Sequence, residues 1–146
     1  MNLTAHFTLE ELTQSGYAER MGIDNTPDEV VQGRLVYLAG KLELARAILG
    51  APLLVSSGYR CQALNRAVGS KDTSAHMQGL AADFICPGFG SPLVVAQRLA
   101  SRKAELGFDQ LIHEFRRWVH IGFRLDSPRG ELLTIDANGV RVGLVA

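Results

Sequence analysis

A short apolar segment that contains one carboxylate constrains the fold of this chain more than any other feature. Residues 80–85 are bounded by Gly79 and by Pro87, as is typical of a buried strand. Asp83 lies inside this segment, and a carboxylate buried in a strand is costly unless it is paired or bound to a metal. Gly79 permits a sharp turn between the strand and the loop that carries His76. We therefore expect His76 and Asp83 to face a common point.

A second histidine, His120, follows much later, in the apolar segment 118–123. Two imidazoles and one carboxylate, from His76, Asp83 and His120, make up a set of three zinc ligands. Catalytic zinc sites use three protein ligands and leave a fourth position open. In the alternative interpretation, His76 is an exposed loop histidine and Asp83 is buried as the partner of an ion pair.

These residues belong to a longer motif with defined spacing. It reads Ser74-x-His76-x-x-Gly79-x-Ala81-x-Asp83, with Ser57-Gly58-Tyr59-Arg60 before it and Trp118-x-His120 after it. The motif resembles that of the zinc D-alanyl-D-alanine carboxypeptidase family, which includes the vancomycin-resistance dipeptidases and phage L-alanyl-D-glutamate endolysins. The zinc fold of Hedgehog signalling domains is related. The resemblance covers roughly residues 7–123.

The resemblance implies a zinc peptidase that acts on cell-wall peptides and holds one Zn²⁺. We expect an α+β fold in which helices pack on one face of a small, mainly antiparallel sheet, with a zinc cleft at its open face. Residues 1–146 are expected to form one domain. The substrate is expected to be a peptidoglycan stem peptide, cut at a D-Ala-D-Ala or an L-Ala-D-Glu bond, and no residue decides between the two bonds.

Arg60 follows an expected strand over residues 52–57, where a guanidinium can bind a carboxylate in a forked geometry. In the resembling enzymes, this arginine contacts the substrate or stabilises the charge that develops on the carbonyl. The resemblance assigns the same role to Arg60. The alternative is a structural arginine that pairs with a nearby acid.

The general base is where the chain departs from its resembling family. In the dipeptidase branch the base is a glutamate three residues before the last histidine, and Arg117 occupies that position here. Glu114 is the nearest acid across the expected turn, and we take it as the base, with Asp109 in reserve. The alternative for Glu114 is a salt bridge with Arg116 or Arg117.

Three further residues complete the expected site. Ser74 should form hydrogen bonds within its loop or to the site, and Trp118 should pack under His120 or form a wall of the cleft. His113 should point away from the site, because adjacent residues of a strand face opposite sides.

The remaining patterns predict the other elements. Helices are expected over residues 8–12, 27–49 with Thr26 as cap, 61–68 and 92–106, and a loop is expected over 16–25. A hairpin is expected over 108–123. Two edge strands are expected over 131–136 and 140–145, around Asn138-Gly139.

The composition of the chain limits the kinds of partner that it can be expected to bind. Fifteen basic and fifteen acidic residues cancel, which gives no support for nucleic-acid binding, and no apolar run approaches the length of a membrane span. The first residues do not resemble a signal peptide, so we expect synthesis in the cytoplasm and action on the wall after release or export. Cys61 and Cys86 are expected to be free, mostly buried thiols, with a disulfide as the alternative. The oligomeric state is not indicated.

These features favour a phage or prophage endolysin. The alternative is a zinc-stabilised binding or structural module without catalysis, for instance in a phage tail or a wall-binding complex. The arginine at position 117 supports this alternative, because it removes the base from its usual place.

Overall fold

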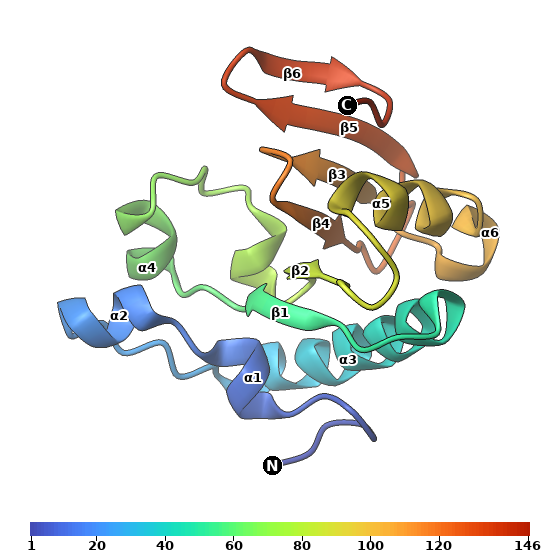
Figure 1. Ribbon diagram of the computed structural model, residues 1–146. Coiled ribbons are helices and arrows are strands. Elements are labelled where there is room, and N and C mark those ends of the chain that lie inside the picture. The colour runs from blue at the N-terminus through green and yellow to red at the C-terminus, as the bar shows by residue number, and fades with distance from the viewer.

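A six-stranded sheet forms the centre of the computed structural model, which describes residues 1–146 (Figure 1). The strand order is β1-β2-β4-β3-β5-β6, and every neighbouring pair is antiparallel except β3 and β5. The strands are β1 Leu54–Ser57, β2 Ala81–Ile85, β3 Gln110–Glu114, β4 Trp118–Gly122, β5 Glu131–Asp136 and β6 Gly139–Val142. The expected α+β architecture with a mainly antiparallel sheet is confirmed.

Six α-helices and one short 3₁₀-helix surround this sheet. They are α1 Leu9–Thr13, α2 Gly16–Met21, α3 Glu29–Leu49, α4 Gln62–Ala67, η1 Ala75–Gln78, α5 Pro92–Ala100 and α6 Lys103–Leu106. None of the helices has both the length and the apolar character that crossing a membrane would require.

The longest helix, α3, begins later than its sequence suggested. Asp28, and not Thr26, is the N-cap, because its carboxylate accepts a hydrogen bond from the Val31 amide at 2.8 Å. The Thr26 hydroxyl donates instead to Asp24 at 2.6 Å. The helix ends as expected, at Gly50, whose left-handed φ of 68° suits a glycine.

Two other expectations about helices were wrong. Residues 16–25 are not a loop throughout, since Ser15 caps the six-residue helix α2 by accepting from the Ala18 amide at 3.1 Å. The helix expected over 92–106 is two helices, and the first ends at Ala100, where the hydroxyl of the C-cap Ser101 donates to the Arg98 carbonyl at 2.6 Å.

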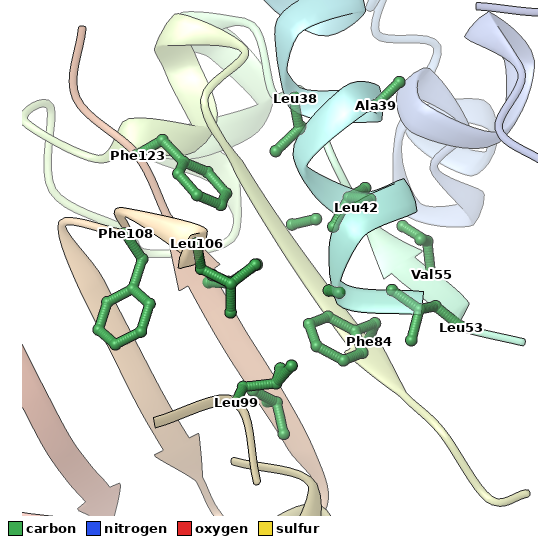
Figure 2. Close-up of a cluster of buried hydrophobic side chains, with 14 of the residues drawn as sticks. Leu38, Ala39, Leu42, Leu53, Val55, Phe84, Leu99, Leu106, Phe108 and Phe123 are labelled. Carbon is green, nitrogen blue, oxygen red and sulfur yellow. The ribbon is translucent and has the colours of Figure 1, made fainter. Parts of the chain in front are cut away.

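Residues of β2, β3 and β4 alternate between the two faces of the sheet. Phe84 of β2 points toward α3 and packs in one continuous core with Leu38 and Leu42 of that helix (Figure 2), and Ala82 of the same strand belongs to this core. Helix α5 packs over β3 and β4 on this face and contributes Leu99 to the core. Burial of these apolar side chains holds the strands against the helices and leaves their alternate residues on the other face.

The opposite face carries the polar side chains of the same strands. In the sheet register, Asp83 lies opposite His120 on β4, and Glu114 lies opposite Trp118. Directly opposed residues of antiparallel strands share a face. The register therefore brings a carboxylate, an imidazole and a second carboxylate onto one side of the sheet.

The C-terminal hairpin differs from its predicted place. β5 is an inner strand, because it pairs with β3 in parallel, and only β6 lies at the edge. β6 ends at Val142 and not at residue 145, because the next residue, Gly143, turns the chain with a φ of 92°. Figure 1 shows this hairpin at the end of the sheet farthest from α3.

The two cysteines are free thiols, as expected. Cys86 is buried, and Cys61 is partly buried at the start of α4.

Candidate metal centre and its cleft

Three potential metal ligands from three elements meet on the open face of the sheet. His76 comes from η1, Asp83 from β2 and His120 from β4, and their ligand atoms lie within 4.8 Å of one another. His76 Nε2 is 3.3 Å from Asp83 Oδ1, and His120 Nδ1 is 2.9 Å from the same oxygen. All three residues are buried, so the alternative of an exposed loop histidine at position 76 is wrong.

His76 is oriented by its own loop. The Ser74 hydroxyl accepts a hydrogen bond from the His76 amide at 3.2 Å, and Gly79 closes η1 in the left-handed region with a φ of 73°. His76 Nδ1 lies 2.7 Å from the Gly58 carbonyl oxygen. A carbonyl only accepts hydrogen bonds, so Nδ1 carries the proton and Nε2 presents a lone pair toward Asp83.

The segment that supplies this carbonyl is fixed by the N-terminal part of the chain. A Cβ on Gly58 would lie 2.3 Å from the Leu12 carbonyl oxygen, so only glycine fits there. The Tyr59 amide donates to that same oxygen at 2.7 Å, and the Arg60 amide donates to the His76 carbonyl at 3.1 Å. Helix α1 therefore helps to hold both His76 and Arg60.

The charges of the cluster shift its pKa values in different directions. Burial alone would raise the pKa of Asp83, but the imidazoles of His76 and His120 outweigh it and hold that pKa far below its usual range. Burial lowers the pKa of His76. For His120 burial also acts downward, but the hydrogen bond and charge of Asp83 prevail and raise its pKa. Asp83 is thus a carboxylate available to a cation.

The geometry fits a zinc ion. Zinc binds imidazole nitrogen and carboxylate oxygen at about 2.0–2.2 Å with tetrahedral angles, which places neighbouring ligand atoms about 3.3 Å apart. The two measured separations, 3.3 Å and 2.9 Å, are close to that spacing. The bond from His76 Nδ1 to the Gly58 carbonyl is the support that metal-binding histidines commonly have on their second nitrogen.

Glu114 lies beside this cluster at the end of β3. Its Oε1 is 4.0 Å from His120 Nδ1, and its Oε2 accepts a hydrogen bond from Trp118 Nε1 at 3.1 Å. Burial and the nearby charge of Asp83 raise the pKa of Glu114. The structure shows no salt bridge from Glu114 to Arg116 or Arg117, and both arginines are exposed in the turn.

Asp109, the other acid considered as a base, is engaged elsewhere. Arg129 donates to Asp109 Oδ1 from its backbone amide at 2.9 Å and from Nε at 3.0 Å, and to Oδ2 from Nη2 at 2.8 Å. Burial acts upward on the pKa of Asp109, but these bonds and the charge of Arg129 lower it overall. This aspartate fixes the loop that leads into β5.

Arg60 lines the same cleft without an acidic partner. Its Nη2 donates to the Ser70 hydroxyl at 3.3 Å, its Nε is buried without a hydrogen-bond partner, and it forms no salt bridge. The structure thus shows a guanidinium with unused donors next to the cluster. Ser74 and Trp118 also line the cleft. His113 does not, because its ring bonds the Val145 carbonyl at 3.0 Å.

One supporting residue escaped the sequence analysis. Asn25 Nδ2 donates to the carbonyls of Thr13 at 2.8 Å and Tyr59 at 3.0 Å, and its Oδ1 accepts from the Cys61 amide at 2.8 Å. Asn25 therefore grips the backbone on both sides of Arg60. No local pattern links Asn25 to these positions, since Thr13 is 12, Tyr59 34 and Cys61 36 residues away in sequence.

The cleft around the cluster encloses about 1020 Å³ and extends well beyond the three candidate ligands. Its polar end contains Arg60, Ser70, Lys71 and Ser74, and its other end is formed by residues of β5 and β6. A cleft of this size can hold several residues of an extended peptide.

Comparison with known proteins identifies one family. A family model described as Peptidase M15 matches residues 5–122 of the chain, a span that contains the whole cluster and Glu114. None of the curated proteins compared with the chain matches it.

Proposed function

Because the chain belongs to the peptidase M15 family of zinc peptidases, we propose that it hydrolyses peptidoglycan stem peptides with one bound zinc ion. The observation that carries the proposal is the buried cluster of His76, Asp83 and His120, with Glu114 4.0 Å away in the same cleft. The match to the family supports peptidase chemistry, and the donor set supports zinc.

His76 through Nε2, Asp83 through Oδ1 and His120 through Nδ1 would hold the ion, since these atoms face one another. Bound zinc acts as a Lewis acid that polarises a peptide carbonyl and makes water more acidic. The carboxylate of Asp83 partly offsets the charge of the ion, and the buried position of the cluster limits competition from solvent.

Glu114 is proposed as the general base and acid. Its carboxylate takes a proton from the attacking water and returns it to the leaving amine. A pKa above the usual range suits both steps, because the carboxyl then holds the proton more readily between them. The hydrogen bond from Trp118 fixes the side chain in its place beside His120. Asp109 is a poor candidate, because Arg129 occupies both of its oxygens.

Arg60 is proposed to bind the substrate and to stabilise the charge that develops on its carbonyl oxygen. Its unpaired Nε and its position in the cleft support this role. Ser74 supports His76 through its hydroxyl, and its place in the cleft lining also suits contact with substrate. The rings of Trp118 and Phe115, tilted by 42° with their centroids 5.6 Å apart, form a wall near Glu114.

The proposed substrate bond is D-Ala-D-Ala or L-Ala-D-Glu, and the proposed biological role is that of a phage or prophage endolysin. Such an enzyme would reach the wall after release or export. We also propose that residues 1–146 form a single peptidase domain.

The test is a digestion of purified peptidoglycan and of free stem peptides by zinc-loaded protein, with products identified by mass spectrometry. The wild type should release a new amine, and the fragment mass identifies the bond. Glu114→Gln should retain zinc and lose about 10²- to 10⁴-fold in kcat. Glu131→Gln is the matched control, because it lies on β5 outside the cleft lining, and it should behave as wild type.

Zinc binding without any released amine from several wall chemistries would contradict the proposal. The non-catalytic binding module would then be the better account.

A further inference from the structure

We propose that the β5–β6 hairpin is an apolar substrate subsite, which binds aliphatic side chains of the peptide several residues away from the scissile bond. The inference rests on the proposed function, since the occupant is the substrate of the candidate metal centre. It assigns a specificity-determining role to Leu133, Ile135 and Val140.

The sheet register places these three side chains on the face that carries the candidate site. Ile135 lies beside Glu114 in the parallel pairing of β3 with β5, and Val140 lies beside Ile135 in the antiparallel pairing with β6. A row therefore crosses the sheet from Glu114 through Ile135 to Val140. A neighbouring row runs from Ile112 to Leu133.

The row is continuous with the cleft. Leu133, Ile135 and Val140 line the same cleft as His76, Asp83 and His120. Leu133 and Ile135 are only partly buried, and Val140 is 64% exposed. Aliphatic side chains that remain open to water beside a catalytic cluster gain free energy when an apolar group covers them.

The other face of the hairpin is anchored, so this wall has a fixed position. The Thr134 hydroxyl donates to the Gly143 carbonyl at 2.8 Å and accepts from the Val145 amide at 3.0 Å. On the face opposite the cleft, His113 Nδ1 lies 3.0 Å from the Val145 carbonyl oxygen. The bonds between Asp109 and Arg129 fix the entry to β5. A rigid wall can select a substrate without the cost of ordering itself.

Strand spacing sets the distance from the reacting bond. Adjacent strands are about 4.8 Å apart, so β5 lies about 10 Å and β6 about 14 Å from His120 on β4. An extended peptide advances about 3.3 Å per residue. A peptide that crosses the strands along the row of Trp118 and Glu114 therefore reaches Ile135 with about its third residue and Val140 with about its fourth, and one that crosses directly from His120 reaches Leu133.

The hairpin also lies outside the part of the chain that the family model matches, which ends at residue 122. The catalytic cluster thus belongs to the matched region, while the apolar wall is added by residues 131–142. The occupant we infer is the stem peptide itself, whose alanine methyl groups are the aliphatic side chains about three to four residues from the scissile bond.

The experiment compares three peptides with zinc-loaded wild type. The first is the shortest peptide that the wild type cleaves. The second and third are this peptide with a Val-Leu or a Ser-Asn extension, added at whichever terminus gives faster cleavage when it is lengthened. The Val-Leu extension should raise kcat/KM about three- to tenfold over Ser-Asn, mainly through KM.

Val140→Lys should abolish this preference and leave cleavage of the shortest peptide unchanged. Val30→Lys is the matched control, because Val30 is 63% exposed, belongs to α3 on the opposite side of the sheet and does not line the cleft. Neither position is buried, so both variants should fold. A second readout is binding without turnover, measured in Glu114→Gln protein by the fluorescence anisotropy of a fluorescein-labelled Val-Leu peptide. When each lysine substitution is added to Glu114→Gln, only Val140→Lys should weaken binding.

Equal kcat/KM for the Val-Leu and Ser-Asn peptides, or the same loss in both lysine variants, would overturn the subsite. That result differs from failure of the proposed function, in which the wild type cleaves none of the three peptides.

Discussion

The two faces of the central strands use the same backbone for opposite purposes. On β2, Phe84 points into the core beneath α3, and its neighbour Asp83 points into the cleft between two imidazoles. One face gains stability by excluding water from apolar side chains. The other face holds Asp83 and His120, whose burial is tolerable because each is hydrogen-bonded to the other. The comparison of the two faces shows that a strand can hold a polar cluster rigidly when its alternate residues are packed in a core.

Phe84→Ala tests the core side of this comparison and should have the largest effect. Removal of a fully buried aromatic ring should lower the free energy of unfolding by about 3–5 kcal/mol. Urea unfolding monitored by circular dichroism measures the change. Below the unfolding transition, the variant should still bind one equivalent of zinc. Loss of zinc binding by the folded variant would show that the two faces are not independent.

Asp83→Asn tests the cleft side, one residue earlier. The amide keeps the shape of the side chain but removes the charge between His76 and His120, so zinc affinity should fall by about 100-fold or more. Competition with a chromophoric chelator measures the affinity, and peptide cleavage should fall with it. Unchanged zinc affinity would remove Asp83 from the ligand set.

Asp109→Asn asks whether a second buried aspartate on the cleft face is structural. Loss of the bonds to Arg129 should lower the free energy of unfolding by about 1–3 kcal/mol at pH 7. The folded-state pKa of Asp109 is lowered, so its contribution is present above the ordinary aspartate pKa near 4 and is lost as pH falls through the folded value.

The stability difference between wild type and Asp109→Asn should therefore shrink as the pH drops below about 4. Asp126→Asn is the control, since Asp126 is exposed in the loop that carries Arg129. A difference that is constant from pH 7 to pH 3 would show that charge is not what Asp109 contributes.

Trp118→Phe should have the smallest effect of the series. It keeps an aromatic ring beside Phe115 but removes the indole donor that binds Glu114. With the carboxylate less well positioned, kcat should fall about two- to tenfold while zinc content stays the same. Steady-state cleavage of a stem peptide provides the measurement, and an unchanged kcat would mean that this hydrogen bond does not position Glu114.

Sequence patterns predicted much of this arrangement, because most of their information is local. Short apolar segments and turn residues indicated the strands around Asp83 and His120, and the glycine at 79 indicated the turn after His76. The helix cap was misplaced because Thr26 and Asp28 are both good caps, and only the folded chain shows that Asp24 takes the threonine hydroxyl.

Helix α2 and the break between α5 and α6 were missed although their contacts are local, whereas other features that were not predicted depend on residues far apart in sequence. The parallel pairing of β3 with β5 joins residues 21 apart, and no local pattern reports it. The same holds for Arg129 as the partner of Asp109 and for Asn25 as the support of the Arg60 segment. Such contacts follow from the packing of the whole chain, where tertiary structure overrides local propensity.

The wide separation of the cluster along the chain has a consequence for how the protein matures. Asp83 and His120 are 37 residues apart and meet only when β4 pairs with β2. Loop closure over such a distance carries an entropic cost, so this pairing belongs to the later and slower events of folding. During synthesis, a chain released up to β2 has His76 and Asp83 but no third ligand. Capture of a metal ion by all three side chains would therefore wait for the pairing of β4 with β2, but would not require β5 or β6, which follow later in the chain.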